Sequence, residues 1–170
     1  MTEPPVAVRH SIDEDIHSIT EIYAREVLTG LASFEVEPPD SAEMAQRRQK
    51  IVQAGFPYLV ATHNENVVGY AYAGPYRTRP AYQFTLENSV YVSPDARRSG
   101  VGRMLLTELI AVCSQGSWHT IIAIIGDSNN TGSIELHKST GFHHVGTIKD
   151  AGFKLGRRVD SVIMQKMLTP

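Results

Sequence analysis

The sequence predicts a mixed α/β fold, because the spacing of its apolar residues changes repeatedly between strand and helix periodicity. Between residues 84 and 92, Leu86, Val90 and Val92 share one parity and polar residues hold much of the other, which is typical of a β-strand. Apolar residues then follow at helical spacing from 101 to 113. Residues 120–125 form a continuous apolar run, as expected for a strand buried on both faces. With 170 residues and neither a linker nor an internal repeat, the chain is expected to form one domain over residues 1–170.

The first third of the chain predicts a short strand and two helices. Residues 6–10 alternate as a strand, and Ser11 then stands where a helix cap would, with Glu14 completing a capping box. This helix ends at Gly30, and Pro38-Pro39 keeps the irregular segment after it from joining the next helix. The second helix has Asp40 or Ser41 as its cap, ends at Gly55, and carries Arg47, Arg48 and Lys50 on what we expect to be a solvated face.

Strands dominate the rest of the chain. They are expected at 58–62 and 67–74 as a hairpin, and then at 81–92, 120–125, 142–148 and 159–167. The helix that starts near 101 is closed by Gly116, and a short helix runs from about Ser133 to Thr140-Gly141. A glycine-rich connection over 150–158 joins the last two strands. The predicted order is β-α-α-β-β-β-α-β-α-β-β, which is mixed α/β.

Charge and composition exclude several kinds of partner and site. The formal charge of −2 gives no electrostatic reason to expect nucleic acid or an anionic membrane. We see neither a signal peptide nor the roughly 20 apolar residues of a membrane span, so we expect a cytoplasmic protein. The one cysteine, Cys113, rules out an internal disulfide and lies on the apolar helix face, which predicts burial. His143 and His144 are adjacent, and because no H-x-x-x-H or C-x-x-C pair occurs, we expect no metal site.

Residues 93–102 predict an anion-binding turn between a strand and a helix. Ser93-Pro94-Asp95 interrupts the strand pattern, and the sequence R-R-S-G-V-G then leads into the helix. Free backbone N–H groups, the positive end of the helix dipole and two guanidinium groups together favour a phosphate. A P-loop is excluded because no Gly-Lys-Ser or Gly-Lys-Thr occurs, and a Rossmann fingerprint is excluded because Leu105 stands where a small residue is needed.

This motif, after a V-Y-V strand, resembles the pyrophosphate-binding motif of the GNAT superfamily of acyl-CoA N-acyltransferases. Four more blocks resemble the phosphinothricin and methionine sulfoximine acetyltransferases within it: Y-R-T-R-P-A-Y, T-L-E-N-S-V-Y-V, N-N-T-G-S-I-E-L-H-K-S-T-G-F and A-G-F-K-L-G-R-R-V-D. The resemblance implies a mostly antiparallel sheet flanked by helices, splayed where the strand before the phosphate helix leaves the next strand. It also implies acetyl-CoA as the acetyl donor, a pantetheine arm in the splayed gap, and a homodimer.

The resemblance assigns donor-binding residues in three places. The turn would hold the pyrophosphate through Arg97, Arg98, Ser99, Gly100, Val101, Gly102 and Arg103. Val90, Tyr91 and Val92 would flank the pantetheine, with the Val92 N–H near the thioester oxygen as an oxyanion donor. Asn130 would bond the pantetheine arm beside Ser133, although Asn and Ser at a helix start are also ordinary caps.

Glu87 is our candidate general base. It is a carboxylate in an otherwise apolar strand, so partial burial would raise its pKa toward neutrality. The resemblance places the catalytic glutamate in this block, whereas the residues alone also allow a solvated Glu or an ion pair. His137 stands near the place where several GNAT enzymes have a tyrosine that protonates the leaving thiolate. It is our second candidate catalytic residue, although a substrate contact or simple packing would explain it equally well.

Candidate acceptor-binding residues lie in two loops and one strand. Arg77 and Arg79, with Thr78 between them, precede the Glu87 strand and favour bidentate capture of acidic oxygens on an amino-acid-like acceptor. The resemblance adds the segment Glu87-Asn88-Ser89 and the upstream pair Ser33-Phe34. The late block reads G-F-K-L-G-R-R-V-D where relatives commonly read G-F-K-F-G-R-W-L-D, so the loss of an aromatic residue there puts the identity of the acceptor in doubt.

These observations lead us to expect an acetyl-CoA-dependent N-acetyltransferase that acts on the α-amino group of a small amino-acid analogue. Phosphinothricin, methionine sulfoximine and methionine sulfone are the candidate acceptors, and their detoxification is the expected role. Another amine, such as a polyamine or a protein N-terminus, is an alternative, but paired arginines would repel a polycation. A non-catalytic acyl-CoA sensor is the other alternative, and Glu87 argues against it because a sensor needs no carboxylate in that strand.

Overall fold

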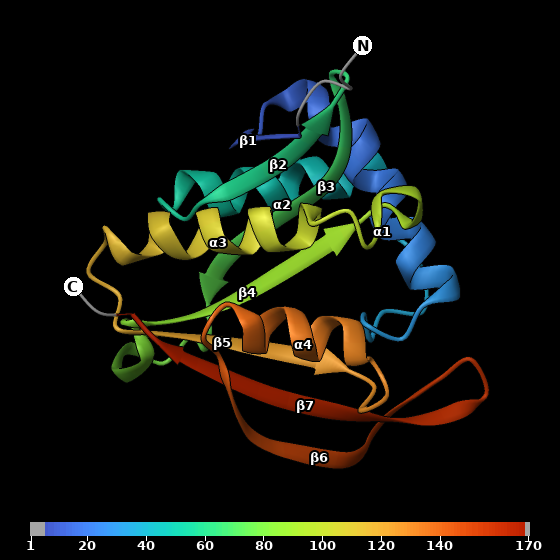
Figure 1. Ribbon diagram of the computed structural model, residues 1–170, viewed down its shortest axis with the longest axis vertical. Coiled ribbons are helices and arrows are strands. Elements are labelled where there is room, and N and C mark those ends of the chain that lie inside the picture. The colour runs from blue at the N-terminus through green and yellow to red at the C-terminus, as the bar shows by residue number, and fades with distance from the viewer. Residues whose placement is uncertain (1–5, 169–170) are drawn as a thin grey trace.

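Seven strands form one sheet, and four helices cover its two faces in a computed structural model that describes residues 6–168 (Figure 1). The strands are β1 (Ala7–His10), β2 (Tyr58–His63), β3 (Asn66–Pro75), β4 (Thr85–Val92), β5 (Thr120–Gly126), β6 (His143–Lys154) and β7 (Arg157–Met167). The helices are α1 (Ile16–Thr29), α2 (Ser41–Gln53), α3 (Val101–Ser114) and α4 (Thr131–Ser139). The predicted order of elements is therefore confirmed.

The sheet is mixed, with the order β1-β2-β3-β4-β5-β7-β6. All neighbouring strands are antiparallel except β4 and β5, which run parallel and are connected through α3. This is the mostly antiparallel sheet that the sequence predicted. Its one parallel pair is also the place where the sheet opens.

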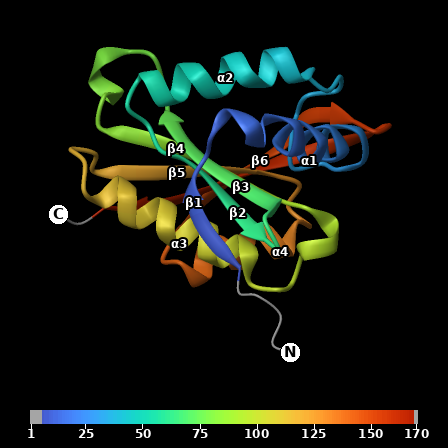
Figure 2. The same ribbon diagram turned by 90° about the horizontal axis from the view of Figure 1, so that it is seen from above.

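The helices lie in two layers, α1 and α2 on one face of the sheet and α3 and α4 on the other (Figure 2). On the α3 side, leucines of α3 and Cys113 pack against apolar residues of the five strands from β2 to β7 that form the middle of the sheet. On the α1 side, Ile19, Tyr23 and Val27 of α1 pack with Met44 of α2 against tyrosines of β2 and β3. Cys113 is fully buried, as predicted, and burial raises the pKa of its thiol to about 12.

Two expectations about the first helices are wrong. Ser11 does not cap α1, because its hydroxyl accepts a hydrogen bond from Arg48 Nε at 2.7 Å, and the Ile12 N–H donates instead to Asp15 Oδ2 at 2.8 Å. Nor do the arginines of α2 lie on a solvated face: Arg48 is buried and also bonds Asp13, while Arg47 binds Glu35. Lys50 is exposed, as expected.

The bounds of three strands, β4, β6 and β7, differ from the prediction for identifiable reasons. Pro80 starts a 3-10 turn over residues 80–82, so β4 begins at Thr85 rather than at 81. The glycine-rich segment 150–158 is not a loop, because β6 and β7 continue through it and meet at a two-residue turn. Leu155 and Gly156 both have positive φ there, 49° and 74°, as a tight hairpin turn requires. A bulge between Ile148 and Gly152, with Asp150 at φ 53°, accounts for the irregular pattern.

No helix in the part of the chain that the structure describes is long and apolar enough to cross a membrane.

Candidate active site

Strand β4 presents two different sets of side chains to the two faces of the sheet. Leu86 and Asn88 are buried toward α3 and α4, whereas Glu87 and Ser89 point to the α1 side, as the alternation predicted. Tyr91 belongs to the second set and packs edge-on against Tyr23 of α1, with ring centroids 5.1 Å apart. Glu87 and its neighbour Asn88 therefore serve opposite sides of the sheet.

The sheet opens beside β4 at the point where its pairing with β5 stops. The parallel pairing joins Thr85–Asn88 to Thr120–Ala123 and goes no further, although β5 continues its pairing with β7 to Gly126. A cavity of about 350 Å³, open to solvent, fills the gap. Residues 88–91 and 123–125 line it, together with Ala32, Ser133 and His137. The splayed gap implied by the resemblance is therefore present.

The backbone of β4 offers alternate residues to this gap. The Ser93 N–H donates to the Val68 carbonyl oxygen, so Ser93 and Val68 form a hydrogen-bonded pair between β4 and β3. Hydrogen-bonded pairs alternate along an antiparallel ladder, so Tyr91 and Tyr70 are the next such pair. The N–H and C=O groups of Val90 and Val92 consequently face away from β3, toward the gap. Of the three residues expected to flank a ligand with their backbone, Val90 and Val92 are free to do so, whereas the backbone of Tyr91 is engaged with β3.

The predicted anion-binding turn leads directly into α3. Gly100 is its last residue before the helix and has φ 87°, a left-handed conformation that glycine adopts without strain, and Arg98 has φ 64°. Gly102 has a different reason to be glycine: a Cβ there would lie 3.2 Å from Leu136, where α3 packs on α4. The N–H groups of the first turn of α3 lack helical partners, as at any helix start. Arg98, Ser99 and Arg103 are exposed around them.

Arg97 differs from the other residues of the turn because it already has an anionic partner. Its guanidinium lies 3.2 Å from Glu26 Oε2 of α1 and 3.5 Å from the Val92 carbonyl oxygen. Glu26 is largely buried and also accepts the Ala32 N–H at 3.0 Å. This ion pair links the turn to the α1 side of the sheet.

Glu87 is a half-buried carboxylate. Burial raises its pKa above the ordinary value, and the nearby Arg77 guanidinium offsets this only in part. Gly74 faces it across the β3–β4 ladder, and a Cβ at Gly74 would meet nothing within 4 Å, so there is open space beside the carboxylate. This combination suits a general base that must reach a bound acceptor.

Asn88 and His137 form a buried pair on the other side of β4. His137 Nδ1 lies 2.8 Å from the Ser133 carbonyl oxygen, which can only accept, so the imidazole proton is on Nδ1. Nε2 then accepts from the Asn88 amide nitrogen at 3.0 Å. Burial lowers the pKa of His137, which keeps it neutral. The Asn88 oxygen, Oδ1, is left as the only buried side-chain polar atom without a partner among the described residues.

At the start of α4 the polar side chains act as caps, as one of the two interpretations predicted. The Asn130 side-chain oxygen accepts the Ser133 N–H at 3.2 Å, and its nitrogen lies 3.5 Å from the Gly126 carbonyl. Ser133 Oγ lies 3.5 Å from His137 Nδ1. Ser133 also lines the gap, so the caps and the cavity share this corner of the molecule.

The Ser33-Phe34 loop is fastened to the β6–β7 hairpin. The buried Lys154 donates through Nζ to the Ser33 carbonyl at 2.6 Å, and the Phe34 ring lies against Gly152, where a Cβ would clash at 2.4 Å. Ser33 Oγ in turn lies 2.9 Å from the Tyr23 hydroxyl. The late sequence block thus meets the upstream loop through Lys154, a residue that no local pattern distinguishes from an ordinary exposed lysine.

The two candidate arginines differ in their relation to Glu87. Arg77 lies over the Tyr76 ring at 4.8 Å and is near enough to act on the Glu87 pKa. Thr78 and Arg79 are exposed in the same loop, with no recorded contact to Glu87.

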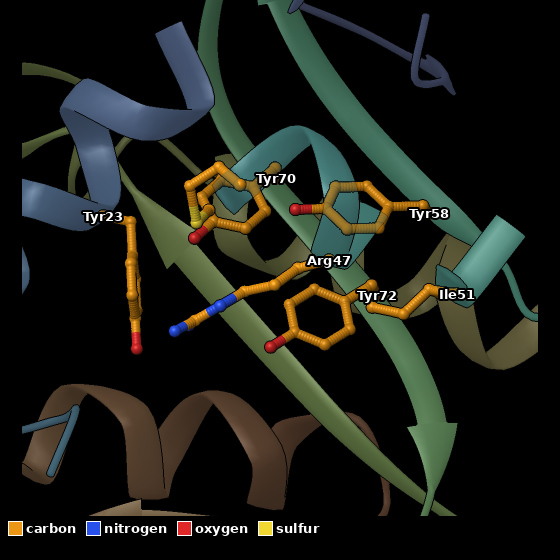
Figure 3. A pocket seen from close by; sticks show the side chains of 7 residues that line it. Tyr23, Arg47, Ile51, Tyr58, Tyr70 and Tyr72 are labelled. Carbon is orange, nitrogen blue, oxygen red and sulfur yellow. The ribbon is translucent and has the colours of Figure 1, made fainter. Parts of the chain in front are cut away.

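A second cavity, of about 260 Å³, lies on the α1 side between α1, α2 and β3 (Figure 3). Its lining is Tyr23, Met44, Arg47, Ile51, Tyr58, Tyr70 and Tyr72. Figure 3 shows Arg47 reaching across it, with the hydroxyl ends of Tyr58, Tyr70 and Tyr72 directed toward the side on which the guanidinium lies. None of these residues was a candidate site residue from the sequence, because tyrosines at strand spacing predict side chains of the hydrophobic core.

The part of the chain that the structure describes holds no cluster of three or more His, Cys, Asp or Glu side chains suited to a metal ion.

The family model described as an acetyltransferase (GNAT) domain matches residues 8–163. A phosphinothricin N-acetyltransferase of Alcaligenes faecalis is 53% identical over 161 residues, which span 95% of this chain and 82% of the relative. An L-methionine sulfoximine/L-methionine sulfone acetyltransferase of Salmonella typhimurium is 34% identical over 163 residues, spanning 96% of this chain and 95% of the relative.

The fold has close counterparts among solved structures. A GNAT superfamily phosphinothricin acetyltransferase from Sinorhizobium meliloti, solved in complex with AcCoA, superposes with a TM-score of 0.93 at 44% identity. The match covers 96% of this chain and 88% of that one. With a splayed β4–β5 pair, a glycine-bearing turn at the start of α3 and a family match over most of its length, the chain belongs to the GNAT family of acetyltransferases.

Proposed function

We propose that this acetyltransferase transfers an acetyl group from acetyl-CoA to the α-amino group of a small amino-acid analogue. Phosphinothricin, methionine sulfoximine and methionine sulfone are the acceptors that the similar enzymes suggest. The observation that carries the proposal is Glu87, a half-buried carboxylate of raised pKa next to open space on the α1 side of β4. An amine that attacks a thioester must first lose a proton, and such a carboxylate can take it.

The residues around the gap fit acetyl-CoA along its whole length. The turn from Arg97 to Arg103 offers cationic side chains and the N–H groups of a helix start to the pyrophosphate. The gap beside β4 offers the backbone groups of Val90 and Val92 to the amides of the pantetheine arm. Ser133 lines the gap, and the Asn130 side chain, which caps α4 by accepting the Ser133 N–H, is the other candidate contact for the arm at this helix start.

The proposed chemistry is a direct transfer. Glu87 takes the ammonium proton, directly or through one water, and the freed nitrogen attacks the thioester carbonyl carbon. A strand N–H facing the gap, that of Val92, stabilises the developing oxyanion. Collapse of the tetrahedral species breaks the C–S bond and forms the amide, and the nitrogen releases its second proton. The leaving thiolate takes up one proton, so the overall transfer is balanced.

His137 acts in this scheme by positioning Asn88. Its Nδ1 proton is committed to Ser133 and its Nε2 lone pair to Asn88, so neither nitrogen is free to exchange a proton with substrate. Asn88, proposed from the sequence as an acceptor contact, is among the residues that line the gap, and its buried oxygen has no partner. An amide N–H of the pantetheine arm is the donor that this oxygen needs.

The acceptor would enter from the α1 side. Arg77, with Thr78 and Arg79 in the same loop, stands near Glu87 to meet the acceptor carboxylate, and Ser33, Phe34 and Ser89 border the same space. A second copy of the chain would cover the hairpin β6–β7, where Val145, Ile148, Phe153 and Leu155 are all more than half exposed. We therefore propose a homodimer in the cytoplasm.

Release of free thiol from acetyl-CoA across a panel of amines tests the function. The panel holds phosphinothricin, methionine sulfoximine, methionine sulfone, ordinary amino acids, spermidine and a peptide with a free N-terminus. We expect turnover to be confined to the first three. Turnover of spermidine or the peptide alone would replace the proposed acceptor class, and binding of acetyl-CoA without any turnover would identify a sensor.

A further inference from the structure

The tyrosine- and arginine-lined cavity on the α1 side lies next to the space beside Glu87. Tyr72 of β3 is paired with Ser89 of β4, and Gly74 is paired with Glu87, so Tyr72 and Glu87 are diagonal neighbours on one face of the sheet. The distance along a strand between such positions is roughly 7 Å. An amino acid with its amine at Glu87 and a side chain of three or four heavy atoms spans that distance and brings its terminal group to the cavity.

The cavity walls combine aromatic surface with unused hydrogen-bond donors. The rings of Tyr58, Tyr70 and Tyr72 lie nearly parallel, with interplanar angles of 3° to 11°. Burial raises the pKa of all three phenols, so they remain O–H donors. Among the described residues, no side chain or carbonyl is recorded as a hydrogen-bond partner of the Tyr58 or Tyr70 hydroxyl. A ligand group with strongly polar oxygens would meet donors there.

The charge of Arg47 is already compensated inside this cavity. Its guanidinium bonds Glu35 through both terminal nitrogens, at 2.7 and 3.2 Å, and bonds Glu43 through Nε at 3.0 Å. Desolvation would raise the pKa of Glu35, but the hydrogen bonds from Arg47 and Tyr23 outweigh it and lower that pKa, so Glu35 is ionised. One guanidinium thus stands between two carboxylates, and the Lys154 ammonium also acts on Glu35, so both carboxylates already have cationic partners. A third anion would have to displace one of them and would be repelled by both.

We propose that this cavity binds the terminal group of the acceptor's side chain and selects a group that is polar but uncharged, such as a sulfone or sulfoximine, over an anionic phosphinate. The proposal rests on the proposed function and names the acceptor class within it. Sulfone oxygens accept the phenol O–H groups and the remaining guanidinium N–H without adding charge. Met44 and the tyrosine rings give the adjoining methyl and methylene groups an apolar wall.

The ratio of kcat/KM for methionine sulfone to that for phosphinothricin measures this selection. We expect the unmodified enzyme to favour the sulfone by about tenfold or more, since like charges at close range cost several kcal/mol. Glu35→Gln keeps the shape and the Tyr23 contact but uncovers part of the Arg47 charge, and because the Glu35 side chain is 37% exposed, the ratio should fall by several-fold to about tenfold. Glu43→Gln is the matched control: the Glu43 side chain is 51% exposed, and solvent screening should keep its effect to about twofold.

Two further variants test the donors rather than the charge. Tyr58→Phe and Tyr70→Phe should each lower kcat/KM for methionine sulfone several-fold while leaving the Kd of CoA nearly unchanged. The proposed selectivity is wrong if Glu35→Gln leaves the ratio of kcat/KM values unchanged. It is also wrong if the unmodified enzyme favours phosphinothricin.

Calorimetric titration of the enzyme–CoA complex with methionine sulfone separates this proposal from the function on which it rests. If binding of methionine sulfone weakens in the Tyr→Phe variants, the cavity binds the acceptor even where no acetylation occurs. If binding is the same in these variants, the proposed role of the cavity is wrong. Absence of turnover with every amino-acid analogue would remove the proposed function instead.

Discussion

The Asn88 amide nitrogen donates to His137 Nε2 at 3.0 Å across 49 residues of sequence, and this bond fixes which end of the amide faces the gap. The Ser133 carbonyl holds the imidazole proton on Nδ1, so Asn88 cannot turn its oxygen toward the ring without placing two acceptors together. A buried amide oxygen without a partner costs about 1–3 kcal/mol. A ligand that supplies the donor would recover this cost, and we propose the pantetheine arm of the donor substrate for that role.

Removing the Asn88 side chain should weaken binding of the pantetheine arm and nothing else. We expect Asn88→Ala to raise the Kd of CoA by about 3- to 10-fold, the usual weight of one buried hydrogen bond, and to leave the Kd of 3′,5′-ADP, which lacks the arm, unchanged. Isothermal titration of both ligands checks this. Ser89→Ala is the matched control because its side chain faces the α1 side. An equal loss for both ligands would point to a general disturbance of the fold.

Glu87→Gln should abolish the base while keeping the shape of the site. Turnover should fall by about 10²- to 10⁴-fold, as for other positioned bases, while the affinity for CoA is retained. Steady-state thiol release and CoA titration on the same preparation measure the two quantities. Near-normal turnover would contradict the assignment of Glu87 as the base.

The pH dependence of kcat/KM should report the environment of Glu87. Burial raises its pKa and Arg77 lowers it, so activity should decline as pH falls through a value above that of an ordinary glutamate. Arg77→Ala removes the positive charge that lowers the Glu87 pKa, so the acidic limb of the pH profile should move to higher pH. Arg79→Ala is the control: only burial and Arg77 shift the Glu87 pKa, so this variant should leave the acidic limb in place. An acidic limb that moves to lower pH in Arg77→Ala would have the wrong sign for this account.

Local periodicity was enough to predict the framework of the site. The alternation in β4 correctly separates Leu86 from Glu87, and the glycine-bearing turn correctly leads into α3. These features depend on a few consecutive residues. The splayed gap was implied by resemblance, because the end of pairing between β4 and β5 depends on strands that are far apart in the chain.

The features that sequence reasoning missed are contacts between distant segments. Arg47 and Arg48 sit among polar residues of α2 and therefore read as solvated, yet their partners are Glu35, Ser11 and Asp13, 12 to 37 residues away. The sequence interpretation grouped Asn88 with Glu87, although adjacent strand residues point to opposite faces, and Asn88 bonds His137 of α4.

The ion pair between Arg97 and Glu26 sets up a competition that binding of acetyl-CoA must resolve. Arg97 belongs to the turn expected to hold the pyrophosphate, but without ligand its guanidinium is bonded to a largely buried carboxylate. Glu26→Gln removes the negative charge and keeps an oxygen for the Ala32 N–H, so Arg97 becomes free for phosphate. We expect the Kd of 3′,5′-ADP and of CoA to fall about two- to fivefold, in keeping with the modest worth of a partly exposed ion pair.

The salt dependence of the gain in affinity distinguishes an electrostatic effect of Glu26→Gln from a conformational one. Screening weakens an exposed cation's attraction to phosphate, so the gain in Glu26→Gln should shrink as ionic strength rises from about 0.01 to 1 M, over which the Debye length falls from roughly 30 to 3 Å. Arg97→Gln combined with Glu26→Gln should cancel the gain at every salt concentration. A gain that survives both high salt and the loss of Arg97 would mean that Glu26 acts through the α1 loop at Ala32 rather than through the turn.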